Sequence, residues 1–361
     1  MLFEPFNLAG IELKNRIVRS ATYEKRADED GFVTESLIEL YETLVRGGVG
    51  LIITGNALVH PSGRTVRQMI CIHSDIYIQG LKKLTSSVHE LGGVIAIQIT
   101  HGGRQSPPIL LGGNPPLAPS AVYDPSTRVM PKAMTDTEIW EVIDAFGDAA
   151  RRARIANFDA VQIHGAHGYL VSEFLSPHTN RRDDYWGGDE ERRFHFLEEV
   201  YKAIRKEVGE DYPLMIKINS SDMIDGGLRV EEAVRIARRL EGLGINAIEV
   251  SGGMHESGQK TSQKDVLSPD REAYFREAGR LFKKNLNVPV MLVGGMRSQA
   301  VMEDVLQKGE ADMISLSRPL IREPDLPNKF RKSKKKADCI SCNGCMNLQK
   351  LDVVRCVQIK R

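Results

Sequence analysis

Short apolar runs alternate with longer amphipathic segments along almost the whole chain. The runs are rich in Val and Ile, a composition typical of strands. We expect eight strands, at Arg16–Ser20, Gly50–Thr54, Val94–Thr100, Ala160–His164, Leu214–Asn219, Ala247–Ser251, Val290–Gly294 and Met313–Leu316. Helical spacing of the apolar positions predicts helices near Glu35–Gly47, Ser74–Leu91, Asp136–Ala156, Asp189–Val208, Val230–Leu243, Pro269–Asn285 and Ser298–Lys308.

Each predicted strand is an almost continuous apolar run, as expected for a parallel sheet that is covered on both faces. Eight such strands with helices between them favour an α/β fold of the (β/α)₈ TIM-barrel type. A doubly wound sheet is the competing fold, but no G-x-G-x-x-G follows the first strand. We therefore expect a barrel over residues 1–330, followed by a short cysteine-rich extension over residues 331–361.

Two connections, His101–Thr135 and His167–Glu190, are much longer than ordinary turns. Loops of that length in compact domains usually cover or shape a binding site. Both leave the carboxyl ends of predicted strands, where a barrel builds its active site. We expect these two loops to form the mouth of the site.

Composition adds little that is unusual. The 361 residues are 41% hydrophobic and 27% charged with a net charge of +1, so bulk charge points to neither nucleic acid nor membrane. No signal-like segment opens the chain, and runs such as Val94–Ile97 are too short to span a bilayer. The five cysteines then favour a reducing compartment, and we expect a cytoplasmic protein.

The most informative stretch is Ala160–Leu170, an apolar strand that ends in a cluster of polar rings. His164, His167 and Tyr169 follow one another at the carboxyl end of this strand, where the active site of a barrel lies. Two imidazoles and a phenol can stabilise a developing oxyanion and deliver a proton. These three residues are the catalytic candidates.

Other strand ends carry groups that suit a planar cofactor. Candidates to contact its ring are Ser20, Ala21, Thr22, Gly55 and Gln98. The amide of the last of these offers both a donor and an acceptor, although it could equally be a satisfied residue of the barrel interior.

A lysine inside an apolar strand is costly unless its charge is paired or used. Lys217 lies in such a run, Met215–Asn219. It could form a Schiff base, as in aldolase barrels, or place a cation beside an electron-rich cofactor. The structural alternative is a buried salt bridge.

The last two strands predict a phosphate site. Gly294 and Gly295 follow the seventh strand just before a helix, and Ser317 and Arg318 follow the eighth. Loops at these two positions commonly bind phosphate in barrels, and an arginine adds a fork of donors. The ligand is therefore expected to carry a phosphate.

Together these residues resemble the old yellow enzyme family, the FMN-dependent ene-reductases with a (β/α)₈ barrel. The resemblance covers roughly the first 330 residues. Its markers are Asn15-Arg16 before Ser20-Ala21-Thr22, Gln98-x-x-His101-x-Gly103-Arg104, His164-Gly-Ala-His167-Gly-Tyr169-Leu170, Glu173-Phe-Leu-Ser-Pro177, Asn180-Arg-Arg182-x-Asp184-Tyr-Trp-Gly-Gly188, Gly294-Gly295 and Ser317-Arg318-Pro319.

The resemblance implies a role for each candidate. Ala21, Thr22, Gly55 and Gln98 would line the flavin ring, and Lys217 would stand where the family usually has arginine. The phosphate of FMN would be held by Gly294, Gly295, Ser317 and Arg318.

The resemblance also implies a reaction. His164 and His167 would polarise an activated alkene, and Tyr169 would protonate it. NADH or NADPH would supply the electrons, and barrels of this family commonly form homo-oligomers.

The tail carries four cysteines, Cys339, Cys342, Cys345 and Cys356. Thiolates at such spacing suit zinc or an iron–sulfur cluster, and free thiols are the third alternative. The tail is similar to the branch of 2,4-dienoyl-CoA reductase and trimethylamine dehydrogenase, which has a four-iron cluster, but two of its gaps are one residue shorter. Since this chain ends at Arg361, a cluster here is expected either to exchange electrons with a partner electron-transfer protein or to have only a structural role. The basic run Arg331–Lys336 before it is expected to be a solvated linker.

Overall fold

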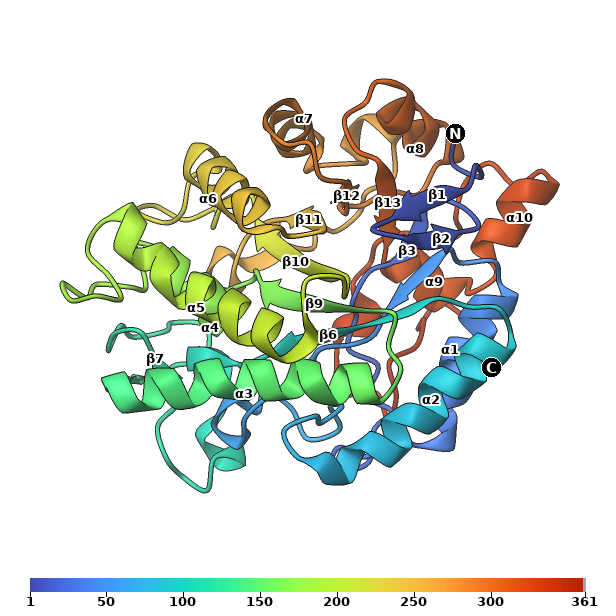
Figure 1. Cartoon of the computed structure of the whole chain (residues 1–361). Helices are drawn as coiled ribbons and strands as arrows, with labels where there is room; N and C mark the ends of the chain where they lie inside the picture. The colour runs from blue at the N-terminus through green and yellow to red at the C-terminus, as the bar shows by residue number, and fades with distance from the viewer. Residues whose placement is uncertain (360–361) are drawn as a thin grey trace.

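Eight parallel strands form a closed barrel in the computed structural model, which describes residues 1–359 (Figure 1). The order around the sheet is β4-β3-β13-β12-β11-β10-β9-β6, and β4 also pairs with β6, which closes the ring. The strands are β3 Ile17–Arg19, β4 Leu51–Ile53, β6 Ile95–Thr100, β9 Ala160–Gly165, β10 Leu214–Asn219, β11 Ala247–Ser251, β12 Val290–Leu292 and β13 Met313–Leu316. The (β/α)₈ prediction is confirmed, and the strands agree with the predicted ones to within a few residues.

Helices surround the ring, as the predicted order required (Figure 1). The main ones are α1 Glu35–Arg46, α2 Ile78–Glu90, α3 Asp136–Ile155, α5 Glu190–Val208, α6 Val230–Leu243, α7 Arg276–Asn285 and α8 Gln299–Gln307. Three shorter helices are α4 Leu170–Leu175, α9 Arg318–Arg322 and α10 Leu326–Lys332. The predicted helix at Pro269–Asn285 is interrupted, because Glu272 and Ala273 leave the helical conformation before α7 begins.

Side-chain alternation divides every strand between two environments. Outward residues such as Ile97, Ile163 and Ile216 pack with the helices in the larger core. Inward residues at the amino ends of the strands form a second, smaller core inside the barrel, which includes Ala160 and Met215. A hairpin of β1 Phe6–Leu8 and β2 Ile11–Leu13 adds its leucines to this inner core and covers that end of the barrel.

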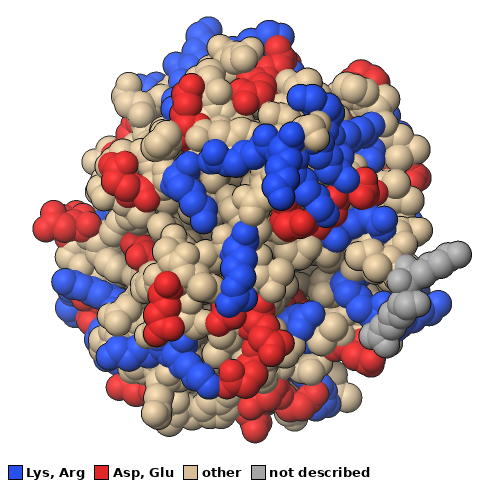
Figure 2. All heavy atoms as spheres, turned by 90° about the vertical axis from the view of Figure 1, so that its right-hand side faces the viewer, with Lys and Arg blue, Asp and Glu red and all other residues tan. Residues whose placement is uncertain are grey.

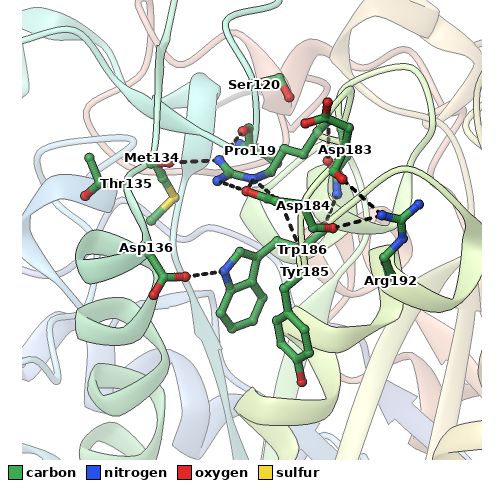
Figure 3. A network of polar contacts seen from close by, with 12 residues as sticks. Pro119, Ser120, Met134, Thr135, Asp136, Asp183, Asp184, Tyr185, Trp186 and Arg192 are labelled. Atoms are coloured by element: carbon green, nitrogen blue, oxygen red, sulfur yellow. Dashed lines mark hydrogen bonds and ion pairs between the residues drawn. The ribbon is translucent and has the colours of Figure 1, made fainter.

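The two long loops predicted to form the mouth are joined to each other (Figure 3). The Arg182 guanidinium donates to the carbonyl oxygens of Pro119 and Met134 at 2.9 and 2.8 Å. The Trp186 indole N–H donates to the Asp136 carboxylate, at the start of α3, at 2.6 Å. These contacts hold the two loops as one unit at the carboxyl ends of the strands.

The basic run before the tail is partly docked rather than wholly solvated. Lys334 Nζ lies 2.9 Å from the Glu323 carboxylate, and Lys336 Nζ donates to the Leu267 carbonyl at 2.7 Å. Figure 2 shows basic side chains gathered in the upper part of the face that carries α1, α2 and α10, with acidic ones below them. Residues 360 and 361 of the predicted tail lie outside the described residues, and no helix among those described is long and apolar enough to cross a membrane.

Candidate functional site

Two cavities meet at the carboxyl ends of the barrel strands. The first, the arginine cavity, is lined by Ser20, Lys217, Gly295, Ser317, Arg318 and neighbouring residues. The second, the histidine cavity, is lined by Thr22, Gln98, His164, Tyr169, His255 and others. Both are lined by Ala21, His167, Thr261 and Ser262, so they form one elongated space.

The floor of this space is a layer of polar side chains inside the barrel. Alternate residues of a strand point inward, so each of these polar residues follows an apolar residue of the inner core by two positions along its strand. Gln98 Nε2 donates to Gln162 Oε1 at 2.7 Å, and Gln162 Nε2 donates to Glu249 Oε2 at 2.9 Å. Lys217 Nζ lies 3.3 Å from Glu249 Oε2 and donates to Ser20 Oγ at 2.8 Å. Lys217 thus has the anionic partner that its burial demanded.

The catalytic candidates lie together in the histidine cavity. The rings of His164 and His167 are 5.2 Å apart between centroids, and the Tyr169 ring is 4.6 Å from that of His164, both edge to face. His167 has a φ of 65°, a left-handed conformation that turns the chain sharply after β9. His167 Nε2 lies 2.8 Å from Ser251 Oγ, at the end of β11.

Burial fixes the protonation of these rings. It lowers the pKa of His164 well below its usual value and that of His167 to about 3, so both imidazoles are neutral near neutral pH. The Ala166 amide donates to His164 Nδ1 at 3.3 Å, which leaves Nε2 as the nitrogen that carries hydrogen. Burial also raises the pKa of Tyr169 to about 12. The cavity therefore offers donors rather than charges.

The arginine cavity has the features of a phosphate site. Arg318 begins α9 and donates to the Gln263 carbonyl at 2.7 Å, and its guanidinium also contacts the Asn343 side chain. A Cβ on Gly295 would lie 2.6 Å from the Tyr274 ring, so only glycine fits there. The helix start after Gly295 is less open than predicted, because the Arg297 and Ser298 amides both donate to Glu272.

The combined space fits FMN. Three buried polar atoms that line the arginine cavity, Ser315 Oγ, Thr261 Oγ1 and Arg297 Nε, have no hydrogen-bond partner among residues 1–359. Such atoms need a partner, and a polar phosphate and sugar-alcohol chain would supply one. The histidine cavity, with a volume of about 360 Å³, falls within the ~300–1,000 Å³ usual for small-molecule sites.

Two predicted cofactor residues stand apart from the cavity walls. Gly55 donates its amide to Glu24 at 2.7 Å, and a Cβ there would clash with the same carboxyl group. Gly294 has a φ of 132°, which the turn after β12 requires, whereas Gly295 lines the cavity itself. These glycines keep the backbone compact behind the site.

Sequence reasoning missed three residues of the site. Gln162 and Glu249 complete the polar floor, and His255 lines the histidine cavity with its ring centroid 5.9 Å from that of Tyr169. Glu249 had a visible signal, because it interrupts the apolar strand Ala247–Ser251 as Lys217 interrupts its own strand. His255 follows a loop and carried no such signal.

The tail that carries the cysteines reaches the edge of the same space, because Ser341 lines the arginine cavity and Met346 lines the histidine cavity. Cys339 is buried, and burial raises its pKa and that of Cys345, the latter to about 11. Asn343, between the second and third cysteines, lines the histidine cavity and contacts Arg318. Among the described residues no group of His, Cys, Asp or Glu side chains has the geometry of a metal site.

Comparison with known proteins shows the family to which this chain belongs. A family model described as the NADH:flavin oxidoreductase / NADH oxidase family matches residues 1–337. An NADPH dehydrogenase of Geobacillus sp. (strain WCH70) is 40% identical over 329 residues, covering 91% of this chain and 92% of that protein.

Longer proteins match over a slightly larger share of the chain. An NADH oxidase of Thermoanaerobacter brockii is 38% identical over 354 residues, which are 96% of this chain but 53% of that protein. A solved structure of 2-naphthoyl-CoA reductase with 2-naphthoyl-CoA superposes with a TM-score of 0.88 at 30% identity, over 95% of this chain and 54% of its own. The chain spans about half the length of these two relatives.

Proposed function

Because the chain belongs to the NADH:flavin oxidoreductase / NADH oxidase family, we propose that it is an FMN-dependent ene-reductase. It takes electrons from NADH or NADPH and reduces the activated C=C bond of a small α,β-unsaturated carbonyl compound. The observation that carries this proposal is the meeting of two neutral imidazoles and a phenol in a cavity continuous with a phosphate-type pocket. The five free cysteines fit a reducing compartment such as the cytoplasm, and we expect a homo-oligomer.

Each residue of the site has a part in this reaction. FMN, when bound, supplies the hydride that goes to the β-carbon. His164 and His167 donate hydrogen bonds to the substrate oxygen, where negative charge develops. Tyr169 gives its proton to the α-carbon, and Gln98, Thr22 and Ala21 would contact the flavin ring.

One experiment tests the proposal directly. Purified protein, reconstituted with FMN if needed, is reduced anaerobically with NADPH or NADH and then mixed with an α,β-unsaturated ketone. We expect bleaching of the flavin absorbance by the nucleotide and its return with the ketone, with a saturated ketone as product. Protein that binds no FMN, or flavin that is reduced but not reoxidised by any activated alkene, would contradict the proposal.

Replacing the arginine of the phosphate-type pocket tests the placement of the cofactor. We expect Arg318→Ala to weaken FMN affinity about tenfold or more, because hydrogen bonds to charged groups contribute roughly 1.5–3 kcal/mol. Turnover at saturating FMN should change much less. Equilibrium dialysis with FMN measures the effect, and Arg235→Ala, on the exposed side of α6, is the matched control. Unchanged affinity in the first variant would remove the phosphate assignment.

A second candidate function is reduction of an enoyl or aryl thioester with an iron–sulfur cluster in the tail. It is favoured by the tail's position against the cavity and by the likeness to 2-naphthoyl-CoA reductase. Cys339, Cys342, Cys345 and Cys356 would be the ligands, and a redox protein would exchange electrons with the cluster.

Metal analysis separates the two functions. If the tail holds a four-iron cluster, protein purified anaerobically should contain about four irons per chain, and Cys342→Ala should lose them while keeping FMN. Cys71→Ala, outside the tail, is the control. Zinc in place of iron would assign a structural role to the tail. Metal-free protein with full ene-reductase activity would exclude the second function and support the first.

A further inference from the structure

A single ion pair lies in the polar floor beneath the two cavities. Glu249 is fully buried, and its Oε2 is 3.3 Å from Lys217 Nζ. The two residues are register partners on β10 and β11. Ser20 and Gln162 also donate to the carboxylate, at 2.6 and 2.9 Å, so all three polar neighbours stabilise its charged, accepting form.

The charge of this pair acts on whatever lies in the cavities. Lys217 lines the arginine cavity, whereas Glu249 is placed behind it and behind Ser20. In a water-poor interior, charges are weakly screened, so both charges act on a bound ligand more strongly than they would in water. The lysine favours extra negative charge on the ligand, and the glutamate opposes it.

We propose that Glu249 is a positioning and tuning residue that partly cancels the charge of Lys217 and so lowers the reduction potential of bound flavin. The inference rests on the proposed FMN function. Reduction adds electrons to the ring, so a nearby cation raises the potential and a nearby carboxylate lowers it. The fully buried pair sets the potential at a value between those that either charge alone would give.

The pair also has a reason to be kept together. Removing one partner of a buried ion pair leaves an uncompensated charge, whereas replacing both by neutral residues is often tolerated. Glu249 therefore keeps Lys217 charged in the absence of ligand. Burial by itself lowers the pKa of Lys217 and works against that charge.

Three variants test the proposal by two measurements on FMN-loaded protein, the midpoint potential and the affinity for sulfite. Sulfite adds to flavin N5 and leaves negative charge on the ring. Glu249→Gln should raise the potential and tighten sulfite binding about tenfold, which for a two-electron couple corresponds to about 30 mV. Lys217→Met should shift both in the opposite direction.

The double variant decides between compensation and simple disruption. Lys217→Met with Glu249→Gln removes both charges, so its potential should return close to that of the unaltered protein. Glu323→Gln removes another buried carboxylate, which is paired with Lys334 at 2.9 Å and is not among the residues that line the two cavities, and it should leave the potential unchanged.

The outcomes are distinct from failure of the proposed function. Protein without bound flavin would defeat the function, whereas normal flavin with an unshifted potential in Glu249→Gln would overturn this inference alone. If that variant does not fold, the difference in potential between Lys217→Met and the double variant still measures the effect of the carboxylate. A potential that does not rise from the first of these to the second also overturns the inference.

Discussion

Replacing both histidines of the cavity should lower the turnover of an activated alkene by at least about a thousandfold while FMN stays bound. Removal of one donor to a developing oxyanion costs about 10²–10³ in rate, and the two imidazoles form one site, so their effects need not add. The measurement is the rate at which reduced enzyme is reoxidised by an α,β-unsaturated ketone. A phenol should also lose most of its affinity for the oxidised flavin protein.

The two positions call for different substitutions. His164 lies within β9, where alanine keeps the strand. His167 has a left-handed backbone, and its amide donates to Asn219 Oδ1 at 3.0 Å. Glycine adopts that conformation without strain and offers no side-chain donor, so His164→Ala with His167→Gly removes both donors.

The control is His195→Asn, which removes a half-buried imidazole that stacks on Tyr185 outside the cavity. It should have unchanged kinetics. A double variant that keeps its affinity for phenol would contradict the role of the pair as oxyanion donors. Loss of FMN in the double variant would instead show that the histidines hold the cofactor.

The barrel and the ends of its strands could be predicted because both follow from local periodicity. A strand that is apolar until its last residues leaves the apolar core there, which placed His164 and Ser317 at the mouth before any contact was known. The glycines and the arginine after the last two strands indicated a phosphate site by their residue type alone. These signals are all contained in a few neighbouring residues.

The remaining features depend on which strands become neighbours. The pairing of Lys217 with Glu249 joins residues of two strands, and their register is fixed only when the barrel closes. Gly55 looked like a residue of the cavity wall, yet Glu24, from a distant loop, occupies its amide. His255 reaches the cavity through a loop whose path depends on tertiary contacts. Sequence periodicity contains none of these long-range choices.

Tyr169→Phe should separate the two halves of the reaction. Flavin reduction by NADPH or NADH needs no proton from this phenol, so its rate should stay unchanged. Reoxidation by an activated alkene should slow by about 10²–10⁴, the usual contribution of a general acid. Anaerobic stopped-flow absorbance measures each half by itself. Tyr185→Phe, at an exposed tyrosine, is the matched control.

The pH dependence provides an independent check on the same residue. Because burial raises the pKa of Tyr169 to about 12, the phenol keeps its proton throughout the neutral range. The reoxidation rate of the unaltered enzyme should therefore be flat from about pH 6 to about pH 9, and should fall only as the phenol ionises at higher pH. In Tyr169→Phe, that high-pH fall should disappear along with most of the rate. Equal slowing of both half-reactions would instead assign Tyr169 to ligand binding, and an unchanged reoxidation rate would leave His255 or solvent as the source of the proton.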